Sequence, residues 1–307
     1  MSDWTEANIP DQTGRIILIT GANSGIGFEA ARALAQRGAT VVMGCRNRSK
    51  AEEAVSHIEA TEPSGSVEIL EMDLSDLDSV AAAADAFRAT NDRLDVLVNN
   101  AGVMATPNQR TAQGFEMQFG VNHLGHFALT GRLLDMLLAT EKSRIVSISS
   151  QGHRGGKLNF DDLNSESKYS AWPAYFQSKL ANLVFTNELQ RRLATADADV
   201  MAVAAHPGAS STNLGHENAG GVLSTMMDKM QPVMRKMAQS PAMGALPTLR
   251  AATDPDVVGG DYYGPDGFLE MKGHPEKVGM SGRALDGDSA RRLWELSTNM
   301  TDVSYDL

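Results

Sequence analysis

The chain has 307 residues, of which 42% are hydrophobic, and this is enough for a sizeable core. Its formal net charge is −11 without a long basic run, so it lacks the cationic surface that binding to DNA or RNA requires. Cys45 is the only cysteine, which excludes an internal disulfide and a cluster of thiolate metal ligands.

The chain opens with a polar, acidic segment, MSDWTEANIPDQTG. This segment is typical of neither a signal peptide nor a transit peptide. No apolar stretch approaches the roughly 20 residues that a helix needs to cross a bilayer. We therefore expect a cytoplasmic protein without a membrane span.

Short apolar runs then alternate with longer helical patterns. Strands are expected at Arg15–Thr20, Thr40–Gly44, Val67–Met72, Leu94–Asn99, Arg144–Ser149, Val200–Ala205 and, more weakly, Asp261–Tyr263. Helices are expected at Gly25–Arg37, Ser49–Thr61, Asp76–Ala89, Gln113–Ala139 and Pro173–Ala194. The first two strands are almost continuously hydrophobic, which is typical of parallel strands covered on both faces. The alternation predicts one α/β domain of the doubly wound Rossmann type, with a mostly parallel seven-stranded sheet.

Two stretches interrupt this alternation. Residues 152–172 form a polar insertion before the last predicted helix, and residues 214–245 are rich in glycine and methionine. Methionine side chains are unbranched and adapt to irregular partners. We therefore expect a substrate lid at about 214–245 over an apolar pocket, with ordinary core packing of one or two helices as the alternative.

A glycine-rich turn, TGANSGIG, joins the first strand to the first helix. Glycines there allow a tight turn and a close approach of the backbone to a pyrophosphate, which also meets the N–H groups of the helix N-terminus. The spacing differs from the common G-x-G-x-x-G pattern, and a plain strand–helix turn is the alternative. The expected dinucleotide contacts are Gly21, Asn23, Ser24, Gly25, Ile26 and Gly27.

The end of the second strand indicates which dinucleotide binds. An NAD site normally has an acidic residue there, which accepts hydrogen bonds from the ribose hydroxyls. This chain has Cys45 and then Arg46. Because a guanidinium binds a phosphate through two charge-assisted bonds, the sequence predicts NADP(H) in preference to NAD(H). The alternative is that Arg46 only caps a loop in solvent.

Other strand ends supply further cofactor candidates, since ligands bind at the carboxyl ends of strands in open α/β sheets. Asp73 could accept a bond from the adenine amino group or only help to start the next helix. Thr212 could meet the nicotinamide carboxamide or a phosphate. The full set is Asp73, Leu74, Asn100, Ala101, Gly102, Pro207, Gly208 and Thr212.

Tyr175 and Lys179 are four residues apart, so a helix places them on one face. A free phenol has a pKa near 10 and is a poor base at neutral pH. An ammonium at about 4 Å, with an effective dielectric constant of ~20, attracts the phenolate by on the order of 4 kcal/mol. We expect Lys179 to lower the pKa of Tyr175, although such pairs also occur by chance.

Two more polar positions complete a candidate active site. Ser149 and Ser150 end the fifth strand, where a hydroxyl can donate to a substrate carbonyl. Asn122 lies within the fourth predicted helix, and asparagine is a mediocre helix former. The presence of Asn122 there predicts a local distortion of the helix that holds a water linked to Lys179. The alternative is an exposed asparagine without such a role. No histidines stand at zinc-type spacing, so no metal is expected.

Together these motifs resemble the short-chain dehydrogenase/reductase family. TGANSGIG, NNAG, the Asn122 segment, the SS pair, YFQSK and HPG follow one another in the family's order between about residues 14 and 208. The resemblance implies that the catalytic set is Asn122, Ser150, Tyr175 and Lys179, with the second serine of the pair active. It also implies that Tyr175 and Lys179 contact the cofactor, and that the protein is a homodimer or homotetramer built on the long helices.

Within the family, the chain is similar to the retinol dehydrogenase-like branch, through CRNRSKAEEA, LNFDDLN and GDYYGPDG. The resemblance implies an NADP(H)-dependent oxidoreductase that interconverts a carbonyl and an alcohol, with Tyr175 as general acid/base. We expect an apolar small molecule as the substrate, lined by Trp172, Phe176 and the Met-rich segment. A cofactor-binding sensor or scaffold without chemistry and a sugar-nucleotide epimerase are the alternatives.

Overall fold

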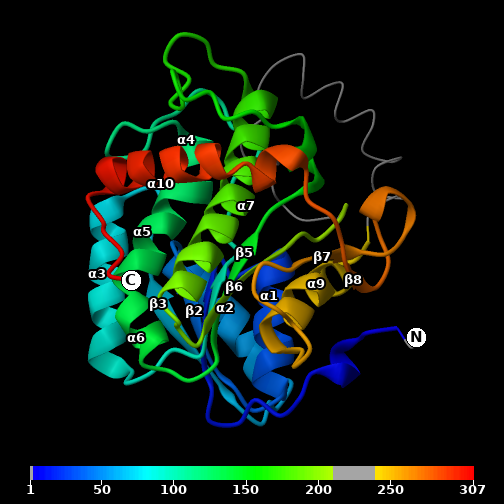
Figure 1. Cartoon of the computed structure of the whole chain (residues 1–307). Helices are drawn as coiled ribbons and strands as arrows, with labels where there is room; N and C mark the ends of the chain where they lie inside the picture. The colour runs from blue at the N-terminus through cyan, green and yellow to red at the C-terminus, as the bar shows by residue number, and fades with distance from the viewer. Residues whose placement is uncertain (1–2, 210–238) are drawn as a thin grey trace.

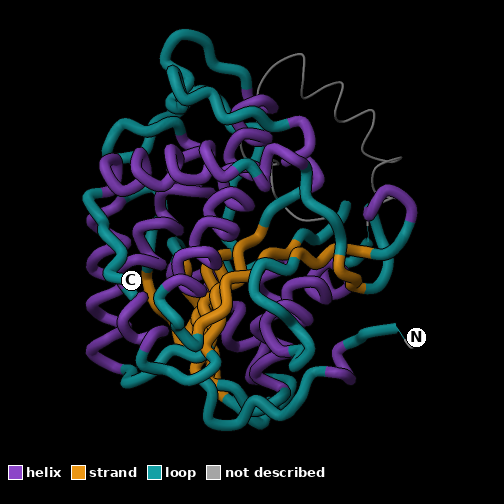
Figure 2. The backbone as a smooth tube through the Cα atoms, viewed as in Figure 1, coloured by secondary structure: helices purple, strands orange, loops and turns teal. Residues whose placement is uncertain are grey.

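The computed structural model describes residues 3–209 and 239–307. Its strands form one sheet in the order β3-β2-β1-β4-β5-β6-β7-β8 (Figures 1 and 2). The strands are β1 Ile16–Thr20, β2 Thr40–Cys45, β3 Ser66–Glu71, β4 Val96–Asn99, β5 Ser143–Ile148, β6 Val200–Ala205, β7 Tyr262–Pro265 and β8 Pro275–Lys277. The first seven are parallel, and β8 pairs antiparallel with β7.

The mostly parallel Rossmann-type sheet is therefore confirmed, and it gains one strand beyond the seven predicted. β8 has three residues, two of them exposed. So short a strand carries no readable alternation of polar and apolar residues, which is why the sequence did not indicate it.

Helices cover both faces of the sheet (Figure 1). One face carries α1 Gly25–Gln36, α2 Arg48–Glu59 and α9 Pro241–Thr253, and the other carries α3 Leu77–Thr90, α5 Gly125–Arg132 and α7 Ala171–Thr195. In β1, Ile17 and Ile19 join the core of the first face while Leu18 joins that of the second. This two-sided burial explains the unbroken apolar runs.

The helix predicted over Gln113–Ala139 is wrong in its start and its continuity. Gly114 has φ +84°, outside the helical region, and the helix begins only at α4 Met117–Phe119. Glu116 caps it by accepting bonds from the N–H groups of Gln118 and Phe119 at 2.9 and 2.7 Å. A π-helical segment follows at Gly120–Leu124, and α6, Leu134–Leu138, is separate from α5.

The C-terminal third contains two helices that the sequence did not indicate. Ser240 caps α9, and Pro241 occupies its first turn, as suits a residue without an N–H group. α10, Gly287–Thr301, crosses α5 and α7 (Figure 1). Most of the expected lid at 214–245, and Thr212, lie outside the described residues; residues 241–245 belong to α9.

Of the helices in residues 3–209 and 239–307, none combines the length and the apolar character that spanning a lipid bilayer requires.

Candidate functional site

The glycine-rich turn after β1 leaves no room for side chains at two of its positions. Gly21 has φ +65°, and a Cβ there would lie 3.0 Å from Cα of Ala101. A Cβ on Gly27 would lie 2.4 Å from the carbonyl oxygen of Gly21 and 2.5 Å from Nδ2 of Asn100. The turn therefore keeps its backbone close to the end of β4, and α1 opens beside it at Gly25.

Thr20, the last residue of β1, connects this turn to the loop after β4. Its hydroxyl accepts bonds from the backbone N–H groups of Asn100 and Ala101, both at 2.9 Å. Nδ2 of Asn100 donates to the carbonyl of Thr20 at 2.7 Å. The sequence analysis missed Thr20, although a polar residue that ends the apolar run RIILIT was a signal for it.

His126 extends this connection to Asn122. Its Nδ1–H donates to the carbonyl of Asn122 at 3.0 Å, and its Nε2 lies 2.8 Å from the Thr20 hydroxyl. Burial lowers the pKa of His126 to about 4, so the ring is neutral at pH 7 and Nε2 accepts the Thr20 proton. Nothing in the sequence around His126 indicated this bond to a residue 106 positions away.

Asn122 lies within the π-helical segment, so the predicted helix distortion is present. The residue is fully buried. Its Oδ1 accepts from the N–H of Val103 at 2.8 Å, and its Nδ2 donates to the Val103 carbonyl and to the Ser178 hydroxyl, both at 2.9 Å. The alternative of an exposed asparagine is wrong. The side chain fastens α7 and the loop after β4 to the distorted helix.

Tyr175 and Lys179 lie on one face of α7, with Nζ of Lys179 at 5.9 Å from the centre of the Tyr175 ring. Nζ donates to the carbonyl of Ile148 at 3.2 Å. Burial lowers the pKa of Lys179 to about 8. Burial also raises the pKa of Tyr175, and a hydrogen bond with the Ser150 hydroxyl opposes that rise. The expected lowering of the Tyr175 pKa is thus wrong, because desolvation, which the sequence cannot show, shifts this pKa upward.

The two serines at the end of β5 have different partners. Ser149 donates to the backbone carbonyl of Lys179 at 2.8 Å, which fastens β5 to α7. The hydroxyl of Ser150 accepts from the N–H of Gly152 at 3.1 Å, and its interaction with Tyr175 opposes the upward shift of the phenol's pKa. Ser150, rather than Ser149, therefore acts on the phenol.

Apolar rings lie beside the Tyr175 phenol. The ring centres of Trp172 and Phe176 lie 6.2 and 6.1 Å from that of Tyr175, and both side chains are half-buried. A Cβ on Gly152 would lie 2.7 Å from the Phe176 ring, so the turn after Ser150 packs against this wall.

The end of β2 carries a cation and no carboxylate of its own. Arg46 is 71% exposed, and its Nη1 is 3.9 Å from Oδ2 of Asp73. Asp73 also accepts from the N–H and the hydroxyl of Ser75, so it shapes its own turn. Cys45 is buried beneath the glycine-rich turn, accepts from the N–H groups of Ala22 and Asn23, and burial raises its pKa to about 11.

The other predicted contacts differ in exposure. Ile26 and Leu74 are buried, and Leu74 packs against the backbone of Gly125. Gly102 lies against the catalytic candidates, because a Cβ there would be 3.3 Å from Nζ of Lys179. Gly208 turns the chain after β6 with φ +65°. The backbone space at Gly21 and Gly27 and the donors of Lys179 fit a nicotinamide dinucleotide.

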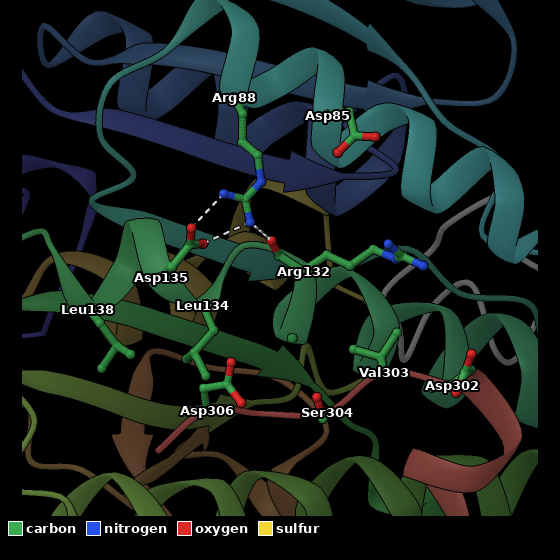
Figure 3. A pocket seen from close by; sticks show the side chains of 11 residues that line it. Asp85, Arg88, Arg132, Leu134, Asp135, Leu138, Asp302, Val303, Ser304 and Asp306 are labelled. Atoms are coloured by element: carbon green, nitrogen blue, oxygen red, sulfur yellow. Dashed lines mark hydrogen bonds and ion pairs between the residues drawn. The ribbon is translucent and has the colours of Figure 1, made fainter.

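A hollow of the molecule lies away from these residues. It measures about 390 Å³ and lies between α3, α5, α6 and the C-terminal segment (Figure 3). Arg88 crosses it and donates to both carboxylate oxygens of Asp135, at 2.6 and 2.8 Å. None of the candidate catalytic residues lines it, so it is not part of the candidate site. Nor do three His, Cys, Asp or Glu side chains gather as metal ligands in the parts that the structure describes.

Comparison with protein families gives one family match. The family described as short chain dehydrogenase matches residues 15–221. Among characterised relatives, mouse retinol dehydrogenase 14 is 40% identical over 94% of this chain and 86% of its own length. Human retinol dehydrogenase 13 is 39% identical over 97% of this chain and 87% of its own length.

Solved structures agree with the fold. An uncharacterized protein from Mycobacterium paratuberculosis is 43% identical, with a TM-score of 0.83 over all of both chains. A short chain dehydrogenase from Shigella flexneri, crystallised with NADP, is 27% identical, with a TM-score of 0.60 over 80% of this chain and 93% of the other.

Proposed function

The chain belongs to the short-chain dehydrogenase family, and from that premise we propose that it uses NADP(H) and Tyr175 to interconvert an apolar carbonyl compound and its alcohol. Family membership and similarity to retinol dehydrogenases establish the broader activity, a carbonyl/alcohol oxidoreductase of small molecules. The cofactor preference, the role of each residue and the substrate class are the proposal.

The observation that carries the proposal is the arrangement of Ser150, Tyr175 and Lys179 where β5 meets α7. During reduction, Tyr175 donates its phenolic proton to the substrate oxygen, and the Ser150 hydroxyl donates a hydrogen bond to the same oxygen. During oxidation the phenolate takes the proton back. The nicotinamide supplies or accepts the hydride.

Lys179 has two tasks in this proposal. Of its three ammonium protons, one is directed to the Ile148 carbonyl, and the others are available for ribose hydroxyls. Its positive charge favours the phenolate and opposes the effect of burial on Tyr175. Asn122 holds the Val103 backbone and the π-helical segment in place beside this lysine and keeps the water through which protons return.

Arg46 supports NADP(H) over NAD(H). Its guanidinium is exposed at the end of β2, where an NAD site has a carboxylate. The test is to measure NADPH and NADH affinities side by side for the wild type and Arg46→Asp. We expect the substitution to weaken NADPH binding by on the order of 100-fold, about the free energy of one or two lost charge-assisted bonds. Equal affinity of the wild type for both cofactors would overturn this part.

Trp172 and Phe176 support an apolar substrate, because they form an aromatic wall beside the phenol. Relatives named retinol dehydrogenases point the same way. The insertion at 152–172 would contribute Trp172 to this wall.

Tyr175→Phe tests the mechanism. Loss of the general acid should lower kcat for carbonyl reduction by about 10²–10⁴-fold. NADPH binding, followed by fluorescence, should change little, because the ring remains. Phe176→Leu is the matched control, since it alters the neighbouring ring without removing a proton donor. Near-normal turnover by Tyr175→Phe would eliminate the proposed mechanism.

A further inference from the structure

The loop between β7 and β8 has an unusual backbone. Leu269 and Glu270 both have φ near +54°, a conformation that costs roughly 1–2 kcal/mol for each residue with a side chain. The neighbouring apolar side chains do not hold this loop in place, because Phe268 and Leu269 are 84% and 67% exposed. The interactions of Glu270, together with hydrogen bonds of the loop backbone, offset this cost.

The Glu270 carboxylate joins three loops at the carboxyl end of the sheet. Its Oε1 accepts from Nη2 of Arg154 at 3.1 Å. Its Oε2 accepts from Nε2 of His206 at 3.0 Å and from the side-chain amide of Gln151. Gln151 directly follows Ser150, and His206 directly precedes Pro207 and Gly208.

The contacts of His206 determine which ring nitrogen carries the proton. The backbone N–H of Gly208 donates to Nδ1 of His206 at 3.2 Å, so Nδ1 has to be an acceptor. Nε2 then carries the hydrogen, and Glu270 is its acceptor. Burial lowers the pKa of His206, and the bond from His206 lowers the pKa of Glu270, so a neutral imidazole faces a carboxylate ion. Carboxylates commonly fix a histidine tautomer in this way.

Two further contacts show that the loops form one unit. The N–H of Ala209, one residue beyond Gly208, donates to the carbonyl of Met271, one residue beyond Glu270, at 2.7 Å. A Cβ on Gly264 would lie 2.0 Å from Nε2 of His206, so the imidazole occupies a slot that only glycine leaves open.

We propose that Glu270 is a positioning residue for the reaction. By accepting the Nε2 hydrogen of His206, it keeps Nδ1 free to receive the Gly208 N–H and so fixes the turn after β6. By accepting from Gln151, it fixes the backbone that carries Ser150. This inference rests on the proposed function, which places Ser150 at the substrate oxygen and Pro207 and Gly208 at the cofactor.

The test compares Glu270→Ala and Glu270→Gln with a control, Glu188→Gln. Glu188 is also a carboxylate bound to arginine, with Arg191 and Arg192 as its partners, but it is buried in the second half of α7. A displacement of about 1 Å in a catalytic group can cost about 100-fold in rate. We expect Glu270→Ala to lower kcat by about that factor. Glu270→Gln should lower it about tenfold, because its remaining oxygen still accepts from His206.

Glu188→Gln should change kcat by less than about twofold, although it also removes a carboxylate from arginine partners. Nitrogen NMR of labelled histidines supplies a readout without activity. We expect the Nε2–H tautomer for His206 in the wild type and in Glu270→Gln, and its loss in Glu270→Ala.

Three results would overturn the inference: an unchanged tautomer in Glu270→Ala, an unchanged kcat in that variant, or an equal loss of kcat in Glu188→Gln. If the wild type turned over no carbonyl compound with NADPH, the proposed function would fail. The tautomer measurement would still report whether Glu270 sets the state of His206.

Discussion

The two halves of the site are built from different kinds of interaction. Around the cofactor candidates, Thr20, Asn100 and His126 connect through neutral groups and backbone N–H groups. On the substrate side, Arg154 and Glu270 connect the loops through charges, and their side chains are 45% and 24% exposed. Buried neutral bonds are insensitive to salt, whereas salt weakens partly exposed ion pairs. The geometry of the cofactor half should therefore change less with salt concentration than the geometry of the substrate half.

Lys179 lies between the halves and should give the largest effect when changed. Its pKa of about 8 means that the side chain is charged below that pH and loses its charge above it. The wild-type kcat/KM for alcohol oxidation should therefore stop rising near pH 8. Lys179→Met should lower kcat/KM by about 10²–10⁴-fold, a range typical of lost proton-transfer catalysis, and should remove this break.

The control for that experiment is Lys277→Met, an exposed lysine paired with Asp261 at the far edge of the sheet. It should leave the pH profile of kcat/KM unchanged. The same break near pH 8 in Lys179→Met would assign it to another group.

Thr20→Val tests whether the neutral half depends on one hydroxyl. The substitution keeps the shape but leaves the N–H groups of Asn100 and Ala101 and Nε2 of His126 without their partner. A buried polar group left unpaired costs about 1–3 kcal/mol, so the free energy of unfolding should fall by at least roughly 3 kcal/mol in urea titrations.

Thr186→Val is the matched control, because Thr186 is equally buried but its hydroxyl makes one bond, to the Asn182 carbonyl at 2.8 Å. It should cost about 1 kcal/mol. Equal losses of unfolding free energy in the two variants would show that the Thr20 hydroxyl contributes no more to stability than the Thr186 hydroxyl does.

Salt should give the smallest effect and should act on the charged half. At saturating NADPH, raising NaCl from about 0.05 to 0.5 M should lower kcat by less than about fivefold, since a partly exposed pair contributes up to about 1 kcal/mol. Arg154→Met should remove this dependence. A salt response that survives in the variant would locate its origin outside the pair of Arg154 and Glu270.

The sequence predicted the parts of the site that depend on local spacing. The glycine-rich turn follows an apolar run, and Tyr175 and Lys179 share a helical face because they are four residues apart. The distortion at Asn122 followed from its poor helix propensity. In each case the residues that gave the prediction and the residues that form the structure lie close together in the chain, within about two helical turns.

The parts that were missed depend on contacts between distant residues. Thr20 and His126 are 106 residues apart, and His206 and Glu270 are 64 apart. No pattern in the chain marks such a pair before the sheet brings the strand ends together. The sequence does not show how deeply a side chain is buried either. For this reason we expected a lowered pKa for Tyr175, whereas burial raises it.

One feature of the C-terminal region bears on assembly. The resemblance to the family implies oligomers built on the long helices, yet α10 already packs there, with Trp294 5.4 Å from Phe127 and 5.9 Å from Phe185 between ring centres. Ser297 adds a bond to His123 at 2.8 Å. The part of α5 and α7 that α10 covers is therefore already buried within a single copy.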